Sequence, residues 1–158
     1  MNRLSDWLKR KVRDPFLAEI KKGVTPDEIA AAVSVSLAIA VNPIIGTTTI
    51  LCLLAGKIFR LNHLIMQTIN YFSYPLQLLL IVPLVRLGEI VTGAEKLPLN
   101  PTLIMEEFNR SFSGFLVKFG MAGLHGLLGW LIAVPPCAFI INFILKAFLR
   151  NWIKSKSA

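Results

Sequence analysis

Four polar side chains lie at helical spacing inside an otherwise apolar stretch of this sequence. They follow one another at intervals of three, four and three residues: Gln67, Asn70, Tyr74 and Gln77. A helix places side chains with this spacing on one face. Amide and phenol groups bind ligands through hydrogen bonds, and in an apolar environment they must face protein or a cavity. The stripe therefore predicts either contact with a substrate or hydrogen bonds that hold helices together.

A second polar group surrounds a proline and a glycine in the preceding apolar stretch. Pro43 lacks a backbone N–H and Gly46 tolerates unusual backbone angles, so an interruption of the helix is expected here. Unwound backbone at membrane depth lies only against protein or a water-filled cavity. We therefore expect this group to share a substrate cavity with the stripe. Its members are Asn42, Pro43, Gly46, Thr47 and Thr48.

The cysteines and histidines form no arrangement typical of an enzyme. Cys52 and Cys137 lie in apolar stretches without a CxxC spacing, and His63 and His125 are far apart in the sequence. No nucleophile elbow, phosphate loop or dinucleotide fingerprint is present. We therefore expect no metal and no cofactor, and an enzyme is the third of three functional hypotheses.

The composition indicates a membrane protein. Apolar residues make up 54% of the 158-residue chain and charged residues 16%, with a mean hydropathy of +0.63. Three stretches lack Asp, Glu, Lys and Arg, and each exceeds the roughly 20 residues that cross a bilayer: Ile29 to Gly56, Leu61 to Val85 and Phe119 to Leu145. A soluble domain with three buried helices would carry charges on its exposed faces. The alternative of a soluble fold is therefore disfavoured.

We expect a single all-α integral membrane domain, residues 1–158, of proline-broken helices. Residues 1–24 predict a basic amphipathic segment that binds anionic lipid headgroups. The capping sequence Thr25 to Glu28 marks the start of the next element. Residues 26–59 predict a broken helical hairpin that is re-entrant, although one long kinked spanning helix would have the same pattern.

The rest of the chain predicts three further elements. Residues 64–90 form a kinked spanning helix that ends on the ion-pair candidates Arg86 and Glu89. Residues 93–113 form a polar connection with an amphipathic helix whose apolar stripe continues to Phe115. Residues 114–149 form a proline-broken segment, broken at Pro135-Pro136, which gives one or two re-entrant hairpins in all. Its small residues predict close helix packing and could also support a homo-oligomer: Ala122, Gly126, Gly129 and Ala133.

The basic residues predict the orientation in the membrane. Seven precede Thr25, two lie between Lys57 and Arg60, and four lie at or beyond Lys146. Basic residues favour the cytoplasmic side, so both termini and the Lys57 to Arg60 turn are expected there. We therefore interpret the net charge of +8 as an adaptation to the membrane surface, and we expect no nucleic-acid partner.

Four short motifs in order carry a resemblance to a known family. They are Pro43 with Gly46 and the following threonines, Arg60-Leu61-Asn62, Tyr74-Pro75-Leu76-Gln77, and Arg86-Leu87-Gly88-Glu89. From about Lys11 to Lys146 the chain resembles the bacterial membrane family of domain of unknown function 2062. Many members have Asn-Pro-Leu-Thr at the third motif, so a role for that asparagine does not carry over. The resemblance implies a small protein of the bacterial cytoplasmic membrane, sometimes joined to glycosyltransferase domains, without an established activity.

Two main functional hypotheses follow. The first is transport or flipping of a lipid-linked or amphipathic substrate in envelope biogenesis, with the two polar groups lining the cavity. The second is a non-catalytic membrane partner or scaffold for an envelope glycosyltransferase, with the glycines and polar residues used for assembly. A hydrated cavity at midplane depth would favour the first hypothesis, and a closed dry bundle would favour the second.

Overall fold

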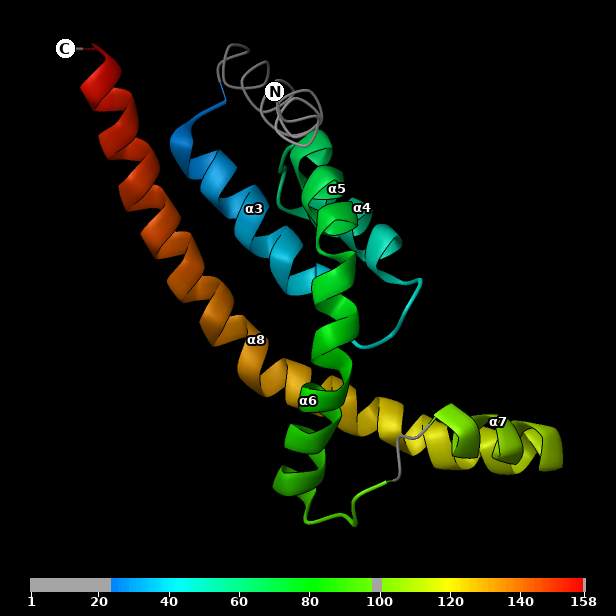
Figure 1. The fold of residues 1–158 in the computed structure, drawn as a ribbon. Coiled ribbons are helices and arrows are strands. Elements are labelled where there is room, and N and C mark those ends of the chain that lie inside the picture. Colours follow the sequence, from blue (N-terminus) through cyan, green and yellow to red (C-terminus); the bar gives the residue numbers. More distant parts are fainter. Residues whose placement is uncertain (1–23, 98–100, 158) are drawn as a thin grey trace, which may run out of the picture.

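The computed structural model describes residues 24–97 and 101–157, and there the chain forms helices and no strands. The predicted all-α fold is thus confirmed for these ranges. The predicted segment 1–24 lies outside the described residues except for Val24. In chain order the helices are α3 (Pro26–Ala40), α4 (Thr48–Ile58), α5 (His63–Phe72), α6 (Tyr74–Thr92), α7 (Pro101–Arg110) and α8 (Phe112–Ser157) (Figure 1).

Helix α3 begins and ends at local signals in the sequence. Glu28 donates its backbone N–H to Thr25 Oγ1 at 3.3 Å, and Thr25 N donates to Glu28 Oε2 at 2.8 Å. This reciprocal cap satisfies two backbone donors at the helix start. The helix ends at Ala40, and residues 41–47 connect it to α4. Gly46 in this connection has a φ of +89°, which suits glycine.

Helices α3, α4 and α5 pack around a small apolar core. Its buried members come from all three helices: Ile29, Ala32, Cys52, Ala55, Ile65 and Met66. Ser36, fully buried on α3, donates its hydroxyl to the Met66 carbonyl at 2.5 Å. Because that carbonyl belongs to α5, the hydrogen bond joins two helices that lie far apart in the sequence. Val24, Leu61 and Leu149 pack against the same core.

The segment predicted as one kinked helix, residues 64–90, consists of two helices that meet at Ser73. Pro75 has no N–H, so the usual hydrogen bond to the Tyr71 carbonyl is missing at this junction. The two parts also pack differently, since α5 contacts α3 and α4 whereas α6 crosses α8. Pro83 lies inside α6 without ending it. The break therefore falls where the lost hydrogen bond coincides with a change of packing partner.

Helix α8 corrects the prediction that residues 114–149 are broken by prolines. It runs without interruption for 46 residues, about 69 Å, through Pro135 and Pro136. Each proline removes only its own backbone hydrogen bond, and packing against α3 and α6 supports the helix on both sides. The helix bends instead of breaking (Figure 1). A second hairpin in this segment is thereby ruled out.

The connection between α6 and α8 contains the expected amphipathic helix, α7. Its predicted apolar stripe is, however, divided between two helices, because α7 ends at Arg110 and α8 begins at Phe112. The rings of Phe112 and Phe115 fold back onto Phe108 with centroid distances of 5.8 and 5.3 Å, both edge to face. These aromatic contacts hold α7 beside the first turns of α8 (Figure 1).

Two helices are long and apolar enough to cross a membrane, Tyr74–Thr92 in α6 and Phe112–Trp152 in α8. Helices α3 and α4, at 15 and 11 residues, extend about 22 and 16 Å. Both are shorter than the roughly 30 Å of bilayer hydrocarbon.

Candidate functional site

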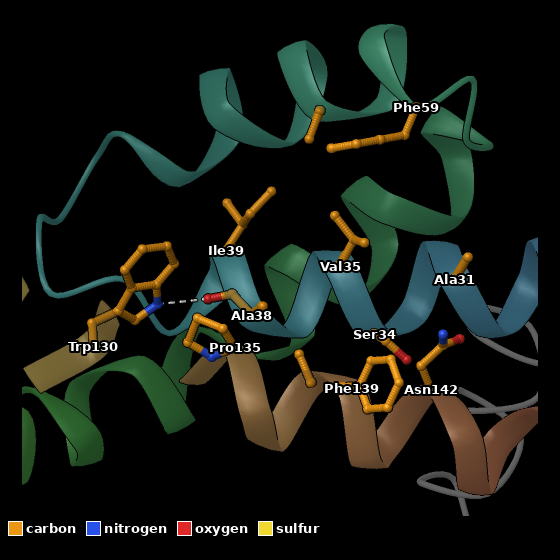
Figure 2. Close-up of a pocket in the computed structure, with 12 residues that line it drawn as sticks. Ala31, Ser34, Val35, Ala38, Ile39, Phe59, Trp130, Pro135, Phe139 and Asn142 are labelled. Carbon is orange, nitrogen blue, oxygen red and sulfur yellow. Dashed lines mark hydrogen bonds between the residues drawn. The ribbon is translucent and has the colours of Figure 1, made fainter. Parts of the chain in front are cut away.

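An apolar groove lies between α3, α4 and α8. Its volume is about 520 Å³, and it is lined almost entirely by apolar atoms. Figure 2 shows α3 along the middle of the groove with α4 on one side and α8 on the other. The wall residues from α3 and α8 are mostly small or aromatic, among them Ala31, Ala38, Trp130, Ala138 and Phe139. Small residues on facing helices create the space, and aromatic rings give it apolar walls.

Polar groups occur at both ends of this groove, which we call the α3–α8 groove. At one end Trp130 donates its Nε1–H to the Ala38 carbonyl at 2.8 Å, which anchors the indole ring to α3 (Figure 2). At the other end the Asn142 amide points toward α3 near Ser34. The Ser34 hydroxyl donates to the Ala30 carbonyl at 2.8 Å. Asn142 Oδ1 is buried and has no hydrogen-bond partner, so this end retains an unused acceptor.

A second, smaller cavity of about 270 Å³ lies between α3, α6 and α8. Its walls are also apolar, and it shares Ala38 and Ala138 with the α3–α8 groove. The predicted packing residue Ala133 and the exposed Cys137 line it. The two cavities therefore lie on either side of the same turn of α8.

Three residues of the predicted stripe form hydrogen bonds between elements, and none of the predicted polar residues lines either of these two cavities. Gln77, which is 1% exposed, donates Nε2–H to the Asn42 carbonyl at 2.7 Å. Gln67 Nε2 donates to the Thr49 carbonyl at 3.2 Å, and Asn70 Nδ2 donates to Thr49 Oγ1 at 3.4 Å. The stripe thus connects α5 and α6 to the 41–47 connection and the start of α4. This arrangement matches the packing alternative for the stripe.

The other candidates near this break are spread over different environments. Tyr74 is 47% exposed, Gly46 is exposed, and a Cβ added to Gly46 would contact nothing within 4 Å. Gly46 is therefore required for its positive φ rather than for close approach of a ligand. Thr47 donates its hydroxyl to the Ile44 carbonyl at 2.8 Å, and Thr48 is buried. The structure brings Asn42 and Gln77 together but leaves Gly46 and Tyr74 outside the buried network.

Helices α6 and α8 cross at the small residues of the predicted packing stripe. A Cβ on Gly129 would overlap the Leu84 carbonyl, and a Cβ on Gly126 would lie 3.1 Å from Val85 Cγ2. Ala122 is buried as well. The crossing also depends on Gly88 of α6, where a Cβ would overlap the backbone of α8. Gly88 was visible in the sequence only as part of a family motif, because a single glycine near a helix end carries no packing signal.

The two ion-pair candidates form a buried charged cluster next to this crossing. Arg86 Nη1 donates to Glu89 Oε2 at 2.6 Å, and Glu89 is 1% exposed. The backbone of Leu97 completes the cluster, because its N–H donates to Glu89 Oε1 at 3.0 Å and its carbonyl accepts from Arg86 Nη2 at 2.9 Å. The residues after α6 are thereby fixed against the helix. The spacing of Arg86 and Glu89 predicted the pair but not the participation of Leu97.

Metal binding has no candidate among the described residues, where no group of three or more His, Cys, Asp or Glu side chains occurs. His125 is buried beside the Gly88 backbone, and its Nδ1 has no hydrogen-bond partner. The contact between His125 and Gly88 could not be predicted from the sequence, because His125 stands alone in an apolar stretch.

These features define a class of helical protein that has an apolar groove and two helices long enough to cross a membrane. The chain belongs to the family of domain of unknown function 2062, whose description is "uncharacterized protein conserved in bacteria" and which matches residues 7–158. The resemblance seen in the sequence is confirmed, and the match extends beyond it at both ends. No curated protein and no solved structure gives a significant match to this chain.

Proposed function

We propose that this chain is an integral protein of the bacterial cytoplasmic membrane in which α6 and α8 span the bilayer. The exposed apolar side chains support this proposal. Leu79 of α6 and Phe139 and Phe143 of α8 are 71 to 75% exposed, and they belong to a much larger set of exposed apolar side chains. Soluble monomers rarely expose contiguous apolar surfaces of this kind, whereas a lipid-facing helix requires them.

In the proposed topology α3 and α4 form a re-entrant hairpin. The two helices pack against each other and are each too short to span the bilayer. Val24, Leu61 and Leu149 contact one core, so the start of α3, the turn after α4 and the last part of α8 lie at one end of the molecule. Basic residues concentrate at this end, which supports a cytoplasmic position for it.

Cysteine labelling tests this topology. In a variant with Cys52 and Cys137 replaced by serine, a cysteine at Arg60 is expected to react only with reagent that reaches the cytoplasm. A cysteine at Glu95, beyond α6, is expected to react with impermeant reagent added outside the cell. Labelling of position 60 from outside would contradict the hairpin, and labelling of both positions from one side would contradict a spanning α6.

The function we propose is to bind an amphipathic, lipid-linked molecule by its hydrocarbon chain and to move it between the two leaflets. The α3–α8 groove is the observation that carries this proposal. A volume of about 520 Å³ is within the 300–1,000 Å³ of typical ligand sites. Its walls are apolar, as a hydrocarbon chain requires, and the unpaired Asn142 acceptor lies at one end. The envelope supplies many molecules of this class.

The shape of the groove suits a hydrocarbon chain. The α3 residues that line it run from Ala31 to Ile39, about 12 Å along the helix axis. A groove that is apolar along this length provides the surroundings that an extended hydrocarbon chain requires.

Lipid movement in vesicles tests the proposal. The purified chain is reconstituted into liposomes that contain a fluorescent lipid, and dithionite is added outside to reduce the fluorophore. The chain is expected to move labelled lipid from the inner to the outer leaflet, so that the fluorescence of both leaflets is lost. Ala138→Phe fills the groove and should abolish this accelerated movement. Ala147→Phe, an equal change at an exposed position of α8, should leave it unchanged. Equal movement in both variants would contradict a role for the groove. If lipid moves no faster in liposomes with the unsubstituted chain than in liposomes without protein, the alternative of a partner for an envelope glycosyltransferase is favoured.

A further inference from the structure

We propose that the Asn142 end of the α3–α8 groove is a headgroup site for lipids that carry an anionic phosphate, with Asn142 and Lys146 as the residues that contact the headgroup. This inference rests on the proposed function, because it assigns the hydrocarbon chain of the same molecule to the groove. It adds the chemical class of the headgroup and the residues that recognise it.

The position of Lys146 follows from helical spacing and from the ion pair beyond it. Asn142, Lys146 and Arg150 are four residues apart on α8 and share one face. Arg150 pairs with Asp27 of α3, with Nη2 to Oδ2 at 2.6 Å and Nε to Oδ1 at 3.0 Å. Asp27 lies one turn before the groove residue Ala31. Lys146 is therefore located between the end of the groove and the ion pair.

The electrostatics of this region leave one cation available. The hydrogen bonds from Arg150 lower the pKa of Asp27, and the nearby charge of Lys146 contributes to the same shift. Asp27 thus remains ionised and uses both carboxylate oxygens on Arg150. No ion pair joins Lys146 to any side chain in the described part of the protein. One positive charge at the groove end is therefore free to pair with a ligand.

The unused groups match a phosphate that follows a hydrocarbon chain. The Lys146 ammonium has three donors and forms strong, charge-assisted hydrogen bonds with phosphate oxygens. Asn142 adds the N–H donors of its side-chain amide, which match the remaining phosphate oxygens. A chain in the groove brings the headgroup to this end. A zwitterionic headgroup adds its own cation next to Lys146, so its binding should be weaker.

Affinities for two lipids with identical chains test the inference. For the full chain in detergent micelles, native mass spectrometry should give at least about tenfold tighter binding of phosphatidic acid than of phosphatidylcholine, as one charged hydrogen bond of about 1.5 kcal/mol predicts. Lys146→Gln should remove this preference and leave phosphatidylcholine binding unchanged. Lys146→Arg should retain the preference for phosphatidic acid, because it keeps the positive charge. Lys96→Gln, a change at an exposed position on the connection after α6, should also leave the preference intact.

The outcomes separate the headgroup site from the groove. Equal binding of both lipids by the unsubstituted chain, or a preference that survives Lys146→Gln, would overturn the headgroup site while the groove stands. Loss of the preference in Lys146→Arg would also overturn the headgroup site, because the positive charge alone should suffice. If neither lipid binds, the groove itself is overturned, and the headgroup site with it. Asn142→Leu should weaken phosphatidic acid binding in addition, and unchanged affinity would remove Asn142 from the site.

Discussion

Gly88→Ala is expected to destabilise the folded protein by about 3 kcal/mol, at the upper end of the cost of overpacking. An alanine Cβ at this position would overlap the carbonyl of His125, and backbone atoms cannot rotate away as a side chain can. The two helices would have to separate, which also disturbs the contact between Gly129 and the Leu84 carbonyl. Thermal unfolding of the purified chain in detergent measures the effect.

The matched control for this prediction is Gly123→Ala on α8. A Cβ at Gly123 meets nothing within 4 Å, and alanine favours a helix over glycine by about 1 kcal/mol. The two glycine-to-alanine changes should therefore have opposite signs. Similar small effects of both would mean that α6 and α8 do not cross as closely as the structure shows.

The second large effect is expected from Arg86→Leu. This change leaves the Glu89 carboxylate, which is 1% exposed, without its cation, and breaking a buried ion pair in this way costs about 3–5 kcal/mol. The lower end of that range applies, because Arg86 is itself 32% exposed. The hydrogen bond from the Leu97 N–H remains but does not neutralise the charge.

A double substitution distinguishes this explanation from a simple loss of packing. Arg86→Leu with Glu89→Leu removes both charges, so it should be clearly more stable than Arg86→Leu alone. The measurement is a double-mutant cycle of unfolding midpoints in one detergent. If the double variant loses as much stability as the sum of the single variants, the two side chains do not act as a pair.

Local signals in the sequence predicted the elements whose limits depend on local chemistry. The capping sequence at Thr25 and Glu28 placed the start of α3, and the Pro43 region placed its end. Proline was a poor guide where packing decides. Pro135 and Pro136 lie inside a continuous helix supported by neighbours, whereas the chain breaks at Ser73, before a single proline. Each proline removes a backbone hydrogen bond, but the sequence does not show where neighbouring helices support the chain despite that loss.

The candidate site was less accessible to sequence analysis than the fold. Polar residues in an apolar stretch were the visible signal, and the structure uses Asn42, Gln67 and Gln77 for hydrogen bonds between elements. The groove is formed mainly by alanine and aromatic residues from three segments, a combination without any motif. Asn142 stands alone in its segment, and its unpaired oxygen becomes evident only when α3 and α8 lie side by side.

The lipid that remains bound to the purified protein tests the central claim most directly. Native mass spectrometry of the chain extracted from bacterial membranes should show one amphipathic lipid per protein, retained after washing in detergent. Ala138→Phe should lose this lipid while remaining folded, and Ala147→Phe should keep it, because position 138 lines the groove and position 147 does not. Retention of the same lipid by a folded Ala138→Phe variant would contradict the α3–α8 groove as the binding site.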